Sequence, residues 1–409
     1  MIENLVEAIK IQTTRDVNEE NMPKLHKFLE KAFPLVHKNM EKTVVNGSLL
    51  FKIHGTGKTI MFCGHMDVVS VNEESWDYPP YGGVIEDGFL YGRGAIDCKN
   101  VVIGLLSAME NLFAEGFTPK NTIYFAFGHD EEIGGANGAN KIVEMLKAQG
   151  VKLDLVLDEG GHVDTDFLPD RKYATIALAE KNILRLKLIA PDKGGHAAGI
   201  SSKTGLYRIA KAIIAIEENP MPTKMIPLVS QYKAVLGESY PKLVENFEEK
   251  YIPLVRNTIA PTMTEASSAP NILPNKASVT CDIRLLPGEE KESVINYIKE
   301  LTKGLDLQFE IVSAKFNNGL VTDFNSFYYK EIEKLIKEKF DDAIVVPTLM
   351  AGGTDASYYQ EICDVVLRFM PMELETKIAK RMHTDNECIS VKSFEKAVDF
   401  YKTFIKMHG

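Results

Sequence analysis

Apolar runs and helical periodicity alternate along the first half of the chain. Runs of apolar residues at 59–63, 122–127 and 153–157 predict buried strands. Between these runs, apolar residues at helical spacing predict helices over 100–115 and 139–148. Strands and helices in this order and of these lengths are typical of a mainly parallel, mixed sheet flanked by helices. We therefore expect an α/β fold.

The pattern changes near residue 180. Residues 182–189 and 277–285 alternate between polar and apolar side chains, as do strands of an antiparallel sheet with one face in water. The other elements expected here are two helices and a strand, at 204–217, 289–303 and 305–312. A proline-rich stretch at 220–261 lacks a regular pattern and is interpreted as a helical excursion. We predict an inserted α+β domain at 180–314.

The two flanking segments, 1–179 and 315–409, would then form a single domain. The remaining elements expected in it are helices at 2–11, 19–33, 327–339 and 391–406, and strands at 48–54 and 365–370. A chain of 409 residues is too long for one compact core, so two domains agree with its length.

Composition narrows the classes of function. The formal charge of −10 and the lack of a Lys/Arg block argue against a nucleic-acid-binding surface. Five scattered cysteines without a C-x-x-C pair indicate a reducing compartment. The start of the chain is acidic rather than signal-like, and no apolar run approaches the roughly 20 residues that span a bilayer. We expect a cytoplasmic protein without a membrane partner.

Acidic and histidine side chains follow the predicted strands directly. His65 and Asp67 follow the first apolar run, Glu131 and Glu132 the second, and a further carboxylate the third. Ligands of open α/β sheets gather beyond the carboxyl ends of the strands. The carboxylate after the third run is one of the adjacent pair Asp158 and Glu159. Asp97 and the loop around His383 add further polar groups to this set. Oxygen and nitrogen ligands without thiolates suit Zn²⁺, Mn²⁺ or Co²⁺.

Each of these features also has a purely structural interpretation. A histidine at a strand end is commonly hydrogen-bonded within the fold, and Glu131-Glu132 could simply begin a helix at its positive dipole end. Asp158-Glu159 before two glycines could be a turn, and the pattern does not decide which of the two would point into a site. The stretch 54–59 resembles the end of a phosphate-binding loop, but Lys52 stands where that motif needs glycine.

The motifs together resemble the M20 metallopeptidases, a family that includes aminoacylases, desuccinylases, dipeptidases and carboxypeptidase S. The resemblance spans nearly the whole chain and is closest to the carboxypeptidase S branch. The matching motifs are His65-Met66-Asp67, Asp97-Cys98-Lys99, Asp130-Glu131-Glu132, Asp158-Glu159-Gly160, Gly194-Gly195-His196, Gly352-Gly353-Thr354-Asp355 and His383. The family implies a zinc-peptidase-like catalytic domain and an inserted lid that pairs two subunits.

The resemblance also implies a role for each catalytic-domain residue. Asp97 would bridge two divalent metal ions, zinc in the first place and manganese or cobalt as alternatives. One ion would be held further by His65 and Glu159, and the other by Glu132 and His383. Asp67 would orient His65, and Glu131 would be the general base.

Residues of the inserted domain receive roles by the same resemblance. His196 would reach the partner's active site in a homodimer formed through the inserted domain. Asn271 and Arg284 would hold the substrate backbone and carboxylate, while Gly353 and Thr354 would line the pocket. Asn100 departs from the family, which often has glycine at this position.

The expected activity is hydrolysis of a peptide or amide bond next to a free α-carboxylate, as in a carboxypeptidase or dipeptidase. An N-acyl-amino-acid amidohydrolase is the first alternative, and a non-catalytic metal- or ligand-binding protein on the same fold is the second. The substrate would be a small peptide or an N-acyl amino acid.

Overall fold

The computed structural model describes residues 1–199, 202–316 and 319–409. These residues divide into two compact units. Unit 1 contains residues 1–179, 322–350 and 354–409, and unit 2 contains residues 180–321 and 351–353. The chain thus leaves unit 1, builds unit 2 and returns.

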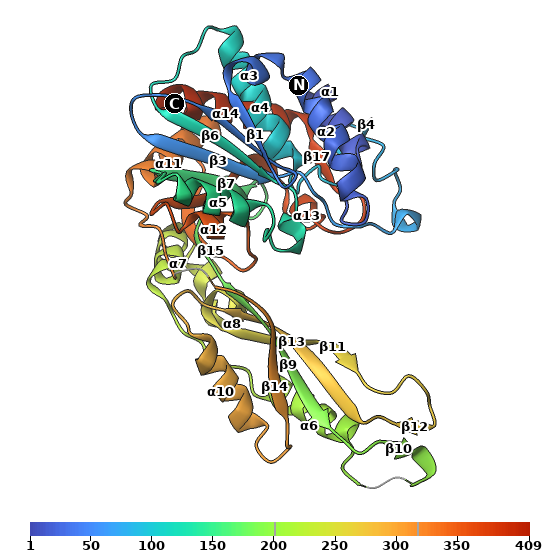
Figure 1. The fold of residues 1–409 in the computed structure, drawn as a ribbon. Coiled ribbons are helices and arrows are strands. Elements are labelled where there is room, and N and C mark those ends of the chain that lie inside the picture. The colour runs from blue at the N-terminus through green and yellow to red at the C-terminus, as the bar shows by residue number, and fades with distance from the viewer. Residues whose placement is uncertain (200–201, 317–318) are drawn as a thin grey trace. The chain divides into compact units, whose positions relative to one another are not determined.

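A large mixed sheet forms the centre of unit 1 (Figure 1). Its strands run in the order β1-β2-β6-β3-β7-β16-β8-β15, with β6, β3, β7 and β16 parallel to one another. Every residue of β6 is buried, because helices cover both faces of the sheet. The strand bounds are β1 Glu41–Val45, β2 Ser48–Ile53, β3 Thr59–His65, β6 Thr122–Gly128, β7 Leu155–Asp164, β8 Tyr173–Glu180, β15 Ile344–Met350 and β16 Val366–Leu374.

Two long helices, α4 and α14, pack against each other and cover one face of this sheet (Figure 1). On the opposite face, α5 packs on β6 and α12 packs on β7. A small sheet of order β17-β5-β4 packs through β17 on α14 and β16. The remaining bounds in unit 1 are α1 Ile2–Lys10, α2 Asn18–Ala32, α3 Pro34–Asn39, α4 Lys99–Ala114, α5 Ala139–Ala148, α11 Phe327–Lys339, α12 Ala356–Tyr359, α13 Thr376–Ala379, α14 Val391–His408, β4 Val84–Glu86, β5 Phe89–Tyr91 and β17 Cys388–Ser390.

The expected α/β class and the parallel strands of the first half are confirmed. Strands β8 and β15 were not expected. The alanine-rich sequence of β8 has low strand propensity, and Pro347 lies within β15. A proline is tolerated there because β15 stands at the end of the strand order, where one side of the strand needs no ladder partner. The stretch 54–59 forms a turn between β2 and β3, with no helix after it.

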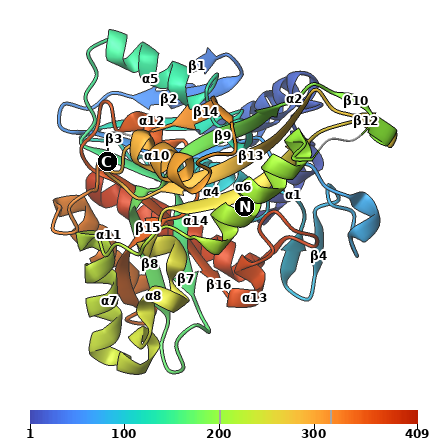
Figure 2. The same ribbon diagram turned by 90° about the horizontal axis from the view of Figure 1, so that it is seen from below.

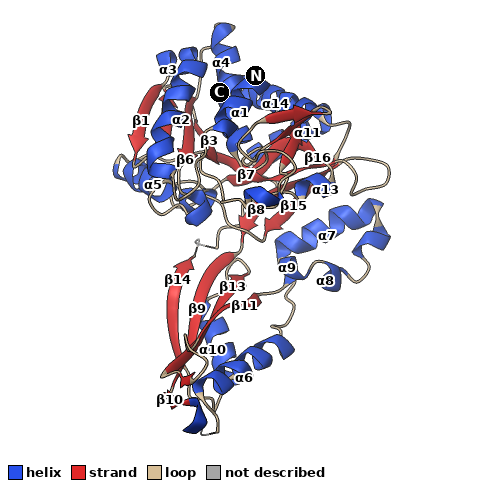
Figure 3. Cartoon of the chain, turned by 90° about the vertical axis from the view of Figure 1, so that its right-hand side faces the viewer, coloured by secondary structure: helices blue, strands red, loops and turns tan. Residues whose placement is uncertain are grey.

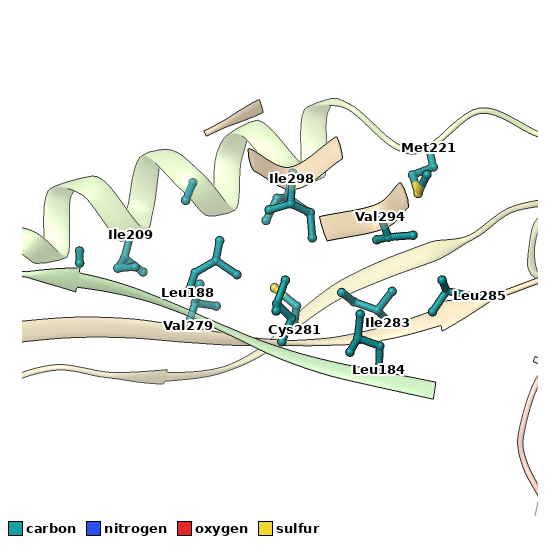
Figure 4. Close-up of a cluster of buried hydrophobic side chains, with 14 of the residues drawn as sticks. Leu184, Leu188, Ile209, Met221, Val279, Cys281, Ile283, Leu285, Val294 and Ile298 are labelled. Carbon is teal, nitrogen blue, oxygen red and sulfur yellow. The ribbon is translucent and has the colours of Figure 1, made fainter. Parts of the chain in front are cut away.

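Unit 2 has an antiparallel sheet of order β11-β13-β9-β14, covered on one face by α6 and α10 (Figures 1 and 3). Alternate residues of β9 and β13, such as Leu184, Leu188, Val279 and Ile283, point into a core shared with the two helices (Figure 4). The alternation expected from the sequence is therefore confirmed. The bounds are α6 Gly205–Glu218, α10 Lys291–Leu301, β9 Asn182–Pro191, β11 Thr258–Glu265, β13 Lys276–Leu285 and β14 Gln308–Lys315.

Two further parts of unit 2 lie at its opposite ends (Figures 1 and 2). At one end, β10 (Gly195–His196) pairs with β12 (Ile272–Leu273). At the other end, most of the proline-rich stretch forms helices, as its interpretation as a helical excursion predicts, while its residues 258–261 begin β11. The helices are α7 Pro227–Ser239, α8 Phe247–Lys250 and α9 Ile252–Val255. Across residues 1–199, 202–316 and 319–409, no helix has the length and apolar character needed to cross a membrane.

Candidate metal centre

His65 is the last residue of β3 and is almost completely buried. Its Nδ1 lies 2.9 Å from the backbone oxygen of Asp67, which fixes the ring and turns Nε2 toward the site. The carboxylate of Asp67 is 3.5 Å from Nδ1 and accepts the backbone N–H groups of Glu131 and Glu132 at 3.2 and 3.1 Å. Asp67 therefore connects the His65 ring to the segment that carries the two glutamates.

A first cluster of ligand atoms surrounds His65 Nε2. Asp97 Oδ1 lies 2.7 Å from this nitrogen, and Glu159 Oε1 lies 3.1 Å from it. All three residues are buried. The Sγ atom of Cys98 belongs to the same cluster. Burial raises the pKa of the Cys98 thiol well above its usual range, which disfavours the thiolate form that a metal ligand needs.

A second cluster forms around His383, which lies beyond α13. Its Nε2 is 2.9 Å from Asp97 Oδ2 and 3.3 Å from Glu132 Oε2. The His383 side chain is 48% exposed, so this cluster is open on one side. The two oxygens of Asp97 thus face different histidines, which is the arrangement that a bridging carboxylate requires.

The charge distribution in these clusters is suited to cations. Burial and then the charge of Asp97 raise the pKa of Glu159 to about 8. Hydrogen bonds to Asp97 and Glu132 raise the pKa of His383 to about 10. The Oε1 atom of Glu132 is buried and has no hydrogen-bond partner among the described residues. Three carboxylates and two histidines therefore fit a pair of divalent ions better than they fit one another.

The alternatives Asp158 and Glu159 differ in direction. Asp158 accepts the backbone N–H groups of Glu159 and Ala356, at 2.9 and 2.8 Å, through its two oxygens. Glu159 extends to His65 instead. Asp158 thus fixes the backbone at Glu159 and Ala356, while Glu159 directs a carboxylate oxygen into the first cluster.

Glu131 lies beside the first cluster, with its Oε2 3.9 Å from His65 Nε2. Its side chain is 13% exposed, and burial, opposed in part by the charge of His65, raises its pKa well above the usual range. A carboxyl group in such a place can exchange a proton with a molecule bound at the cluster.

The sequence did not indicate the residue that holds Asp97 in place. Glu387 is fully buried and accepts the backbone N–H groups of Gly94, Ile96 and Asp97 at 3.2, 2.6 and 3.1 Å. Its other oxygen accepts a hydrogen bond from Arg93 at 2.6 Å. A buried glutamate before a short apolar strand is the one signal that could have been noticed, since a charge is rarely buried without partners.

Two buried side chains at the start of α4, directly after Asp97, bind backbone oxygens. Lys99 donates to the backbone oxygens of Ala8 and Ile11, at 2.9 and 2.6 Å, and burial lowers its pKa to about 7. Asn100 donates to the oxygens of Ala95 and Ile96, at 2.7 and 2.6 Å. The asparagine that departs from the family pattern therefore closes the loop that carries Asp97. The Asp97–Cys98 peptide bond is cis.

The predicted residues of unit 2 fall into two groups. His196 and Asn271 lie together at the β10–β12 pair, where Ala197 donates its N–H to the Asn271 oxygen at 2.9 Å. Arg284 lies at the other end of β13, where its Nε donates to Asp282 at 2.6 Å. A strand rises about 3.3 Å per residue, so Lys276 at the start of β13 and Arg284 are about 26 Å apart. The structure does not bring Asn271 and Arg284 together within one chain.

The predicted pocket residues Gly353 and Thr354 lie where the chain passes from unit 2 back into unit 1. Gly353 belongs to unit 2, where a Cβ atom on it would meet Ile183 and Glu180 at 3.4 and 3.5 Å. Thr354 belongs to unit 1 and is buried, with its Oγ1 3.2 Å from the N–H of Ala356.

Comparisons with known proteins agree on one family. The model of "Peptidase family M20/M25/M40" matches residues 61–407. A relative from Bos taurus named "N-fatty-acyl-amino acid synthase/hydrolase PM20D1" is 31% identical over 99% of this chain and 87% of its own length. "Probable carboxypeptidase S-like 2" of Dictyostelium discoideum is 29% identical over 96% of this chain and 80% of its own length.

A solved structure has the same fold. The "M20 family metallo-carboxypeptidase Sso-CP2 from Sulfolobus solfataricus" aligns with a TM-score of 0.76, covering 100% of this chain and 98% of its own. At a sequence identity of 17%, this similarity is one of fold alone.

Proposed function

Because this chain belongs to peptidase family M20/M25/M40, we propose that it uses two metal ions to cleave a peptide or amide bond next to a free α-carboxylate. The observation that carries the proposal is the position of Asp97, whose two oxygens lie 2.7 and 2.9 Å from the Nε2 atoms of His65 and His383. One carboxylate between two histidines is the geometry of a shared metal ligand.

Asp97 would be common to both ions, with His65 and Glu159 completing one set and Glu132 and His383 the other. Zinc is the expected metal, with manganese or cobalt as alternatives, because the donors are carboxylate oxygens and imidazole nitrogens. Two such ions, when bound, polarise a scissile carbonyl and make water a stronger nucleophile at neutral pH.

Glu131 is the general base in this proposal. It takes a proton from the attacking water, whose oxygen forms a bond to the carbonyl carbon, and returns a proton to the leaving nitrogen as the C–N bond breaks. Asp67 positions Glu131 by accepting its backbone N–H. The Glu131 oxygen at 3.9 Å from His65 Nε2 is close to the cluster without occupying it.

The lid and dimer roles of the inserted domain also belong to this proposal. Unit 1 would be the catalytic domain, and unit 2, expected from the sequence at 180–314, would be the lid through which two chains pair. Arg284 binds the substrate carboxylate in its own chain, while His196 and Asn271 act on the partner's substrate. The separation of about 26 Å along β13 supports this division, because one substrate cannot reach both ends. Gly353 and Thr354 line the carboxylate side of the pocket.

The relatives suggest two substrate classes. One is named as a carboxypeptidase and the other as an N-fatty-acyl-amino acid synthase/hydrolase. Both chemistries release a free α-carboxylate with its amine, so one set of residues could serve either. We place the enzyme in the cytoplasm, a location supported by five cysteines that are all free.

A metal and activity measurement tests the catalytic assignment. Glu131→Ala should keep about two metal ions per chain and lose hydrolysis of N-acetyl amino acids and dipeptides. The neighbouring variant Glu132→Ala is the matched control, and it should lose metal. Metal lost from Glu131→Ala would mean that Glu131 is a ligand and that the base is another residue. A wild-type protein that binds two ions and hydrolyses nothing would support the non-catalytic alternative.

Mixed dimers test the lid assignment. His196→Ala and Glu131→Ala chains are inactive alone, but their mixture should regain activity if His196 acts on the partner's substrate. If the mixture regains nothing, His196 acts within its own chain.

A further inference from the structure

Three charged side chains lie together on the face of the unit 2 sheet that points away from α6 and α10. Cys281 and Ile283 point into the core shared with those helices (Figure 4). Because side chains alternate along a strand, Asp282 and Arg284 project from the opposite face. Arg185 of β9 pairs in register with Asp282, so its side chain lies on that face too. We call Arg185, Asp282 and Arg284 the charge triad.

The guanidinium of Arg284 is held along one edge. Its Nε donates to Asp282 Oδ1 at 2.6 Å, and its Nη2 lies 3.5 Å from Oδ2. In the part of the chain that the structure describes, no residue accepts a hydrogen bond from Nη1. A guanidinium offers five N–H donors in a rigid plane, so the end formed by Nη1 and Nη2 can bind a second carboxylate. The Arg284 side chain is 29% exposed, which makes this end accessible to a ligand.

Arg185 offsets the charge of Asp282. An Asp282–Arg284 pair by itself is neutral, and its carboxylate would repel the carboxylate of a ligand. The Nε of Arg185 lies 3.5 Å from Asp282 Oδ2, so the charge triad carries two positive charges and one negative charge. The surroundings are electropositive, since burial and then the charge of Arg284 lower the pKa of Lys181. The charge triad thus attracts an anion while it holds Arg284 in one direction.

We propose that Asp282 is a positioning residue for Arg284, and that Arg185 keeps the pair attractive to the α-carboxylate of the substrate. The inference rests on the proposed function, in which Arg284 binds that carboxylate. An arginine that is already ordered loses less conformational freedom when a ligand binds. Asp282 therefore strengthens substrate binding through Arg284 and not through a contact of its own.

Steady-state kinetics of the metal-loaded enzyme test the inference, with the N-acetyl amino acid or dipeptide that the wild type hydrolyses best. Asp282→Ala should raise KM about tenfold and change kcat less than about twofold, because the carboxylate is held equally before and during the reaction. Arg284→Ala should raise KM about a hundredfold. Arg185→Ala should raise it about threefold. Asp282→Asn keeps an oxygen that accepts the Nε–H, so its KM should stay within about threefold of the wild-type value.

A double variant separates positioning from a purely structural role. Without Arg284, the carboxylate of Asp282 only repels the substrate, so adding Asp282→Ala to Arg284→Ala should lower KM or leave it unchanged. A residue that merely supports the fold would raise KM in both backgrounds. Glu265→Ala is the matched control, since it removes the partner of Lys187 from the same sheet and should leave KM unchanged.

Three kinetic results would overturn the inference. They are an unchanged KM in Asp282→Ala, a further rise of KM in the double variant, and a rise in Asp282→Asn as large as that in Asp282→Ala.

A binding measurement keeps a failure of this inference apart from a failure of the proposed function. Calorimetry with metal-loaded protein should show leucine binding about tenfold more weakly to Asp282→Ala than to wild type, and leucinamide, which lacks the carboxylate, binding equally to both. If leucine binds in this way but the wild type hydrolyses no N-acetyl amino acid or dipeptide, the proposed function fails alone. If the wild type hydrolyses them and Asp282→Ala binds leucine as the wild type does, the inference fails alone.

Discussion

Replacing Glu387 by glutamine tests whether one buried carboxylate holds the bridging aspartate in place. Oε1 of Glu387 accepts the backbone N–H groups of Gly94, Ile96 and Asp97, and Oε2 pairs with Arg93. Glutamine has the same shape, but one of its two ends is an NH₂ donor. That donor must face either the three N–H groups or the guanidinium, so one set of partners is lost in either orientation.

The expected loss of stability is large. Arg93 and Glu387 have side chains that are 2% and 0% exposed, so the variant leaves an unpaired charge in the interior. Breaking a buried ion pair at one partner costs about 3–5 kcal/mol. We expect a loss of this size in the free energy of unfolding of the metal-free protein, measured in urea with an unchanged m-value. We also expect weaker binding of the metal ions, because the Asp97 loop loses its anchor.

The control is Glu375→Gln, which removes an exposed carboxylate paired with Lys377 and should change neither quantity. Arg93→Met combined with Glu387→Gln should cost less than the two single changes added together, because both act on one network. A loss below about 1 kcal/mol for Glu387→Gln, with normal metal content, would refute the reasoning.

Three other predictions follow from buried groups. Burial and the nearby charge of Arg284 lower the pKa of Lys181 to about 8 in the folded protein, from 10.5. Between these two pH values the unfolded chain binds more protons at Lys181 than the folded protein does, so the free energy of unfolding should rise from pH 8 to 10.5. The free energy of unfolding of Lys181→Met, measured in urea relative to wild type, should be about 3 kcal/mol higher at pH 7 than at pH 11. The same difference between variant and wild type at both pH values would contradict the assignment. Gly161→Ala places a Cβ 2.0 Å from the Thr175 backbone oxygen and should cost about 1–3 kcal/mol or more, while Gly199→Ala, with open space around it, should unfold as wild type does. Removing metal with a chelator should lower the melting temperature. Zinc added back at a concentration a hundredfold above its Kd should raise the free energy of unfolding by about 2.7 kcal/mol. An unchanged melting temperature after chelation would argue against a tightly bound ion.

Much of the centre could be predicted because its residues follow strands. His65 ends β3 and Glu131 follows β6, and both strands are visible as apolar runs. Glu159 instead lies within β7, which continues to Asp164, at an irregularity in the pairing of β7 with β16. The opposite positions of Asn271 and Arg284 also follow from the sequence, since an extended strand separates them. The roles implied by the family resemblance placed both residues on one substrate, because they did not take into account the length of the strand between them.

Other features depend on contacts that no local pattern records. Glu387 binds the N–H of Asp97 across 290 residues of sequence, and nothing near either residue marks the pairing. The choice between Asp158 and Glu159 required the position of Ala356, whose N–H takes one of the two carboxylates out of the site. Strand β15 was missed because Pro347 argues against a strand unless its edge position is known.

The order in which the chain is synthesised has a consequence for the metal centre. Glu387 and His383 lie near the end of the sequence, and both contact the loop that carries Asp97. A chain still attached to the ribosome therefore has His65, Asp97 and Glu159 long before it has the second histidine or the glutamate that fixes the loop. Unit 2 can fold during this interval, because its residues precede the last part of unit 1. In the proposed function, the second ion would therefore bind only after this last part of unit 1 has been made.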